Sequence, residues 1–210
     1  RHEIGRLQKL PVKQLVDALR VVTGGTPLGV GPVLDARSLP RHPFSPDAPA
    51  LSAGIPIIAG ANKDETTVLF PPPDAFSLDW TALRGHLVKA MPGADVDAVI
   101  AGLRRLRPQA SPSDLYFTVT TELGMGAGAR TIAARRTAAG GAPVYLYRLE
   151  WESRANGGRL RSHHGLDVPL VFNNVSEAKS VGDGVAEAQQ VADAMSAAWL
   201  RFARTGIAPE

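Results

Sequence analysis

Residues 55–65 read IPIIAGANKDE, an apolar, β-branched run that ends in Gly-Ala-Asn and leads into two acids. A short apolar run bounded by turn residues is typical of a buried strand. We therefore predict a strand that runs into a loop, with Asp64 and Glu65 directly after it. Loops at strand ends often carry the reactive side chains of α/β proteins, and a carboxylate there can orient a histidine. An exposed acidic pair that caps the next helix fits the pattern equally well.

A second strand is predicted over residues 142–151, APVYLYRLEW, which are rich in aromatic and β-branched side chains. The turn-rich segment 23–54 contains a further short strand candidate around Val30–Leu34. Helices are predicted where apolar residues recur at helical spacing: over 6–22 with a break at Pro11, 79–90, 95–106, 113–141 with Ser113 or Asp114 as N-cap, and 185–204 with Gly206 at its end. Because strands alternate with helices, the sequence predicts an α/β fold.

The composition excludes several classes of protein. The 210 residues include 23 Lys and Arg against 20 Asp and Glu, so the net charge is only +3 and no basic patch indicates nucleic-acid binding. The absence of cysteine excludes disulfides, thiolate metal ligands and a cysteine nucleophile, and it leaves the compartment open. No apolar stretch approaches the roughly 20 residues that a membrane-spanning helix needs.

Residues 161–172, RSHHGLDVPLVF, contain two adjacent histidines. A metal site at His163 and His164 is disfavoured, because neighbouring side chains on a loop or strand point in different directions and no further ligand lies at a usual spacing. A histidine on a loop that follows a strong strand is well placed to act as a catalytic base. A surface or structural histidine fits the stretch as well, and the stretch alone does not separate the two residues.

Five blocks of the sequence resemble the type B carboxylesterases, the family that includes bacterial p-nitrobenzyl esterases and the cholinesterases. In the family's order they are GPVLDARSLPRHPF, PALSAGIPIIAGANKDETTVLF, PVYLYRLEWES, GGRLRSHHGLDVPLVFNNV and MSAAWLRFARTGIAP. The resemblance runs through nearly the whole chain. It implies the C-terminal part of an α/β-hydrolase fold, with an incomplete central sheet and flanking helices, and it implies hydrolysis of carboxylic esters. Residues 1–210 are then a single C-terminal segment, with a helical insertion over about 74–140 between the acid and base strands.

The resemblance also implies roles for individual residues. Glu65 in NKDE matches the family's catalytic acid, and His164 in HHGLD matches its catalytic base, whereas His163 occupies a position that the family leaves variable. Asp167 matches the residue that supports the base, although the family usually has the longer glutamate there. Val68 and Leu69 match positions that line the substrate gorge and are often aromatic in cholinesterases. Here they predict an aliphatic wall without a cation-binding surface.

The sequence contains no match to the Gly-x-Ser-x-Gly turn that carries the family's nucleophile between a strand and a helix. The nearest stretch is ALSAG, but Ser52 in its middle follows a proline-rich loop and precedes a strand, which is the reverse of the required context. TGGTPLG over 23–29 has the character of a connecting turn rather than an oxyanion-binding loop. We therefore expect negligible esterase activity from this chain alone. A catalytically silent interaction or structural module derived from an esterase is the alternative.

The resemblance also predicts partners. The complete enzyme is expected to act on a small-molecule carboxylic ester, with no cofactor and no metal. Without the other strands of the sheet, the strand over 55–60 has an unpaired edge, which is a template for association. The isolated chain is therefore expected to self-associate or to bind a complementary N-terminal fragment.

Overall fold

The computed structural model describes residues 4–22, 31–69 and 71–209, which divide into two compact units, Arg1–Ser45 and Pro46–Glu210. The first unit contains helices α1, Ile4–Leu7, and α2, Val12–Val22, so the predicted break at Pro11 is confirmed. The strand expected around Val30–Leu34 is wrong for residues 31–34, which form no regular structure and lack a neighbouring strand in the described part of the chain; Val30 lies outside that part. The single C-terminal segment over 1–210 stays a prediction.

The second unit is built on a parallel pair of strands, β1, Ile57–Asn62, and β2, Val144–Leu149. Asn62 lies opposite Leu149 in the register, so both strands end at the same edge of the sheet. The helices of this unit are α3, Trp80–Ala90; α4, Val96–Leu106; α5, Pro112–Thr121; α6, Ala127–Ala139; α7, Asp167–Val171; and α8, Val185–Thr205. Both strand predictions and the α/β class are confirmed, since α3 to α6 form the connection between the parallel strands.

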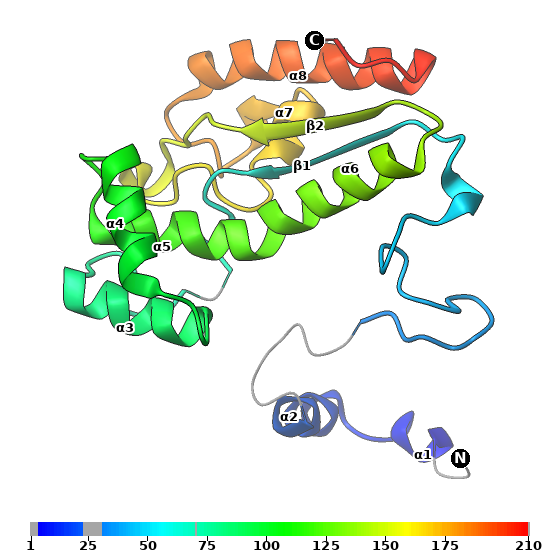
Figure 1. Ribbon diagram of the computed structural model, residues 1–210, viewed down its shortest axis with the longest axis horizontal. Helices are drawn as coiled ribbons and strands as arrows, with labels where there is room; N and C mark the ends of the chain where they lie inside the picture. Colours follow the sequence, from blue (N-terminus) through cyan, green and yellow to red (C-terminus); the bar gives the residue numbers. More distant parts are fainter. Residues whose placement is uncertain (1–3, 23–30, 70, 210) are drawn as a thin grey trace. The chain divides into compact units, whose positions relative to one another are not determined.

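The two strands lie between α8 on one side and α6 on the other (Figure 1). Aromatic side chains join β2 to α8: the ring of Tyr145 lies 6.0 Å from that of Phe202, and the ring of Tyr147 lies 5.0 Å from that of Trp199, both edge to face. Pairs of this geometry add to the stability gained from burial. The apolar face predicted for the last helix therefore packs on the sheet.

The long helix predicted over 113–141 differs from the prediction in two respects. Its N-cap is Ser111, two or three residues earlier than expected, because Ser111 and Asp114 bond each other's backbone N–H groups in a capping box and Pro112 occupies the first turn. Its middle, Glu122–Gly126, is a π-helical turn that separates α5 from α6. The two glycines of this turn, Gly124 and Gly126, weaken regular α-helix, which is consistent with the change of helical pitch.

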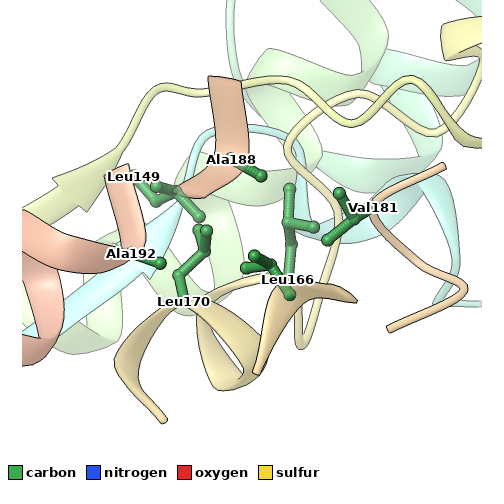
Figure 2. Packing of buried hydrophobic residues seen from close by; sticks show 7 residues of the cluster. Leu149, Leu166, Leu170, Val181, Ala188 and Ala192 are labelled. Atoms are coloured by element: carbon green, nitrogen blue, oxygen red, sulfur yellow. The ribbon is translucent and has the colours of Figure 1, made fainter. Parts of the chain in front are cut away.

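A core cluster lies directly behind the end of the sheet (Figure 2). It joins β2, α7, α8 and the loop between the two helices, and its buried members are Leu149, Leu166, Leu170, Val175, Val181, Ala188 and Ala192. A second cluster holds α3, α4 and α5 together. The first cluster fixes the segment that contains both histidines against the sheet.

Replacing Leu170 by alanine is expected to lower the free energy of unfolding by about 2–5 kcal/mol, since the side chain is fully buried and its removal leaves a cavity. Urea unfolding of the 210-residue chain, followed by circular dichroism, measures the change. Arg201→Ala on the exposed surface of α8 is the control, with an expected change within about 0.5 kcal/mol. Equal effects of the two substitutions would contradict the assignment of Leu170 to the core.

Candidate active site

Two loops meet where the parallel strands end. After Asn62 the chain makes a tight turn into a single 3₁₀ turn that begins at Glu65. After Leu149 it returns through residues 150–163 and brings His164 to the same edge, just before α7. The backbone N–H of Asp64 donates to the carbonyl of Ser162 at 2.9 Å, which ties the two loops together. This arrangement follows from the parallel register, which places both carboxyl ends side by side.

The Nδ1 atom of His164 lies 2.6 Å from Oε2 of Glu65, although the two residues are 99 positions apart in the chain. The Glu65 side chain is only 6% exposed, whereas that of His164 is 52% exposed. The other carboxylate oxygen, Oε1, accepts the backbone N–H of Asn62 at 2.7 Å. A carboxylate bound in this way favours the imidazole tautomer that carries its proton on Nδ1, which leaves the Nε2 lone pair able to accept a proton.

The acidic pair predicted from the sequence separates into two environments. Asp64 is buried beneath the loops, and burial raises the pKa of its carboxyl group against the opposing effects of Lys63 and Arg161. Its Oδ2 lies 3.4 Å from the backbone N–H of Ser162. Asp64 therefore connects the loop after β1 to the loop that precedes His164, and of the two acids only Glu65 contacts the His164 imidazole.

The two histidines also separate. His163 is buried, with Nδ1 at 2.9 Å from its neighbour's carbonyl oxygen and Nε2 at 3.4 Å from the carbonyl oxygen of Ser180. Both ring nitrogens of His163 thus face backbone oxygens inside the fold, which is a structural environment. His164 is the histidine that presents its ring to solvent.

Asp167 lies between the loop and the strands. Its Oδ2 accepts the hydroxyl of Tyr147 at 2.9 Å, and its Oδ1 accepts the side-chain amide of Asn62 at 3.2 Å. Burial, followed by the nearby Asp167 carboxylate, raises the pKa of Tyr147 well above its usual range, so its hydroxyl remains a donor. Within the described residues, Asp167 therefore reaches the loop of His164 through Asn62 rather than by bonding the imidazole.

Three further residues were candidates from the sequence. Val68 and Leu69 follow the 3₁₀ turn of Glu65, with Val68 exposed and Leu69 half-buried. Their role in binding substrate stays a prediction. Ser52 lies before the start of β1, at the end opposite Glu65, and six strand residues at about 3.3 Å each separate the two ends by about 20 Å. Ser52 therefore does not belong to this site.

In the described part of the chain, no group of three or more His, Cys, Asp or Glu side chains is arranged to hold a metal ion. Over the same residues, no helix combines the length and apolar character needed to cross a membrane.

Gly60 is required by the close approach of Tyr147 across the sheet. A Cβ atom at position 60 would lie 2.1 Å from the Tyr147 ring. The same ring carries the hydroxyl group that donates to Asp167. Gly60→Ala is therefore expected to lower the free energy of unfolding by about 1–3 kcal/mol. Gly85→Ala in α3, where nothing lies within 4 Å, is expected to raise it by about 0.5–1 kcal/mol. Thermal unfolding of both variants measures the difference, and a neutral Gly60→Ala would rule out this contact.

The parallel strands, the flanking helices and the acid–histidine pair at the strand ends are the features of an α/β-hydrolase protein. The Carboxylesterase family model matches residues 3–210, and the chain belongs to that family. It is 27% identical over 178 residues to the para-nitrobenzyl esterase of Bacillus subtilis, covering 83% of this chain and 34% of the relative. It is 29% identical over 189 residues to the phenmedipham hydrolase of Pseudarthrobacter oxydans, covering 87% of this chain and 36% of the relative.

Solved structures give the same result. The chain superposes on a carboxylesterase of Geobacillus stearothermophilus with a TM-score of 0.71 and 28% identity, covering 96% of this chain and 41% of that one. An esterase of Clostridium hathewayi matches with a TM-score of 0.62 at 22% identity, covering 99% and 41% of the two chains, and it supports the fold. The predicted α/β-hydrolase fold and the resemblance to type B carboxylesterases are confirmed. The chain spans between 34% and 41% of the length of these relatives.

Proposed function

We propose that this chain supplies the acid and the base of a serine carboxylesterase site, with Glu65 as the acid and His164 as the base. The observation that carries the proposal is the 2.6 Å contact between the buried Glu65 carboxylate and Nδ1 of the exposed His164. Membership of the Carboxylesterase family supports an ester as the substrate. The nucleophilic serine and the oxyanion-binding amides belong, in this proposal, to polypeptide outside residues 1–210.

The proposed reaction follows from the roles of the two side chains. Nε2 of His164 takes the proton of the serine hydroxyl as the serine oxygen attacks the ester carbonyl, and it then donates that proton to the departing alcohol. Water repeats the sequence on the acyl-enzyme and releases the carboxylic acid. Glu65 holds the imidazole in the correct tautomer and stabilises the imidazolium formed in each half-reaction. Asp167 supports the base by fixing its loop.

We propose a small, neutral carboxylic ester as the substrate class. Val68 and Leu69 lie directly beyond Glu65 and offer aliphatic contacts without an aromatic surface for a cation. The name of one relative, a para-nitrobenzyl esterase, refers to a small ester, which supports this substrate class.

The small size of the sheet supports the proposal that a second polypeptide segment completes the fold. Within the described residues β1 pairs only with β2, so one edge of β1 is available for another strand. We propose that the N-terminal portion of the protein pairs there, and self-association is the expected behaviour of the chain without it.

Reconstitution tests the proposed function. Residues 1–210 alone are expected to show negligible hydrolysis of p-nitrophenyl acetate, and co-expression with the preceding N-terminal portion should produce serine-dependent hydrolysis. The control replaces the upstream serine by alanine, which should abolish the activity while the complex still forms. If the complex forms but shows no activity with either serine or alanine at the upstream position, the result would instead favour the alternative of a catalytically silent interaction module. Hydrolysis by residues 1–210 alone at the same rate would contradict the assignment of the nucleophile to another segment.

A further inference from the structure

We propose that Asn62 is a positioning residue for the Glu65–His164 pair, and that its side-chain amide fixes the segment that carries His164 relative to the acid. The inference rests on the function proposed above, because it assigns to Asn62 an effect on the same reaction. In this proposal Asn62 contacts neither the substrate nor the transferred proton.

Asn62 has an unusual position in the fold. It is the last residue of β1, it lies opposite the last residue of β2, and it is only 1% exposed. Its backbone N–H donates to Oε1 of Glu65 at 2.7 Å, which leaves Oε2 to face the imidazole. Any residue except proline could supply that backbone bond, so the specific contribution of Asn62 must come from its side chain.

The side-chain Nδ2 of Asn62 has two hydrogens and two acceptors. One acceptor is the carbonyl oxygen of His163 at 2.8 Å, and the other is Oδ1 of Asp167 at 3.2 Å. The two acceptors lie on either side of His164 in the sequence, so a single amide holds the segment before and after the base. The reversed amide would place its oxygen against both acceptors, and the orientation is therefore fixed.

The remaining atom of the amide, Oδ1, is buried and has no hydrogen-bond partner within the described residues. The contribution of the Asn62 side chain to the position of the His164 loop therefore comes from Nδ2 alone. Burying an amide oxygen without a partner costs stability, and that cost is offset only where the amide provides something a smaller or apolar side chain does not. At Asn62 the amide provides Nδ2, which donates to a residue on each side of His164 in the sequence.

Asn62 thus controls both partners of the pair, the acid through its backbone and the base through its side chain. The distance between Oε2 of Glu65 and Nδ1 of His164 therefore depends on the backbone hydrogen bond of Asn62 to Glu65 and on its side-chain hydrogen bonds to the His164 loop. A displacement of about 1 Å at a reacting centre can lower the rate by about 10²-fold. Loss of the Nδ2 donor should therefore act on the chemical step rather than on the binding of substrate.

The test uses the reconstituted complete protein and the variant Asn62→Leu, which has a similar size and no donor. The expected result is a fall in kcat of about 10²-fold with KM changed by less than about twofold. Ser113→Ala is the matched control, because it removes another buried side-chain bond, from the backbone N–H of Leu78, in the helical region. Its kcat per folded molecule should match that of the wild type.

A double-mutant cycle separates positioning from a general structural effect. In the Glu65→Gln background, where the pair no longer functions, Asn62→Leu should lower kcat by less than about threefold further. The same large factor in both backgrounds would overturn the proposal. If Asn62→Leu does not fold, Asn62→Ala, which removes the same donor and adds no bulk, takes its place in the same cycle with the same expected factors.

Failure of this inference is distinguishable from failure of the proposed function. Full activity of Glu65→Gln itself would overturn the proposed function, and the role of Asn62 with it. Loss of activity in Glu65→Gln together with wild-type kcat in Asn62→Leu would overturn only the role of Asn62.

Discussion

Replacing His164 by alanine in the complete protein is expected to lower kcat for p-nitrophenyl acetate by about 10⁴-fold or more. The imidazole is the only group in the proposed site that accepts the serine proton and returns it to the leaving alcohol. Because the side chain is half exposed and lies at the end of a loop, its removal should leave the fold intact. KM should change little, since the ring contributes to the transition state rather than to ground-state binding.

The matched control for this variant is His86→Ala. His86 also pairs with a carboxylate, because its Nε2 lies 3.0 Å from Oδ2 of Asp74, but it belongs to α3 in the helical region. Loss of one imidazole–carboxylate pair is thus common to both variants, and only the His164 variant should lose activity. Steady-state kinetics on both variants, with folded protein quantified by circular dichroism, make the comparison. Retained activity in His164→Ala would remove His164 from the mechanism.

The sequence was informative where local pattern and tertiary structure agree. The apolar run before Asn62 and the aromatic run over 142–151 each predicted a strand, and both strands form. The parallel register then brings together Glu65 and His164, the two residues for which the family resemblance implies the roles of acid and base. Nothing in composition or spacing alone would have joined two residues 99 positions apart.

Other features depend on information that a pattern does not contain. The acidic pair Asp64 and Glu65 gives no sign of which member is directed at the histidine, because that depends on the turn after β1. The same holds for His163 and His164: one ring nitrogen of His163 faces the carbonyl oxygen of Ser180, whereas the side chain of His164 is exposed. Asn62 reads as a turn residue in the sequence, and its two side-chain contacts exist only once the loops have met.

The N-cap at Ser111 could have been predicted from the sequence. The stretch Ser-Pro-Ser-Asp has a serine followed three positions later by an acid, with proline at the first helical position, which is a helix start pattern. The π-helical turn over Glu122–Gly126 is different, since its two glycines indicate weakness in a helix without specifying its form. Local chemistry therefore predicts where helices begin better than how they are interrupted.

The acid of the pair provides the second large effect. Glu65→Gln in the complete protein is expected to lower kcat by about 10³–10⁴-fold, although glutamine has nearly the same shape as glutamate. Glu65 uses both carboxylate oxygens as acceptors, one from the backbone N–H of Asn62 and one from Nδ1 of His164. A glutamine offers only one oxygen, so one of these two donors must face an NH₂ group instead.

Either orientation of that glutamine is unfavourable, and the more damaging one explains the loss of rate. If its oxygen accepts from Asn62, its NH₂ group faces Nδ1 and selects the tautomer of His164 with the proton on Nε2, which cannot receive the serine proton. If the amide turns over, the imidazole keeps its tautomer but a buried N–H of Asn62 faces another donor, and no negative charge stabilises the imidazolium. Glu152→Gln makes the same chemical change at a half-exposed carboxylate and should leave kcat unaltered. An equal kcat in both variants would mean that Glu65 serves the fold alone, whereas a selective loss with unchanged KM identifies it as the group that keeps His164 ready to accept a proton.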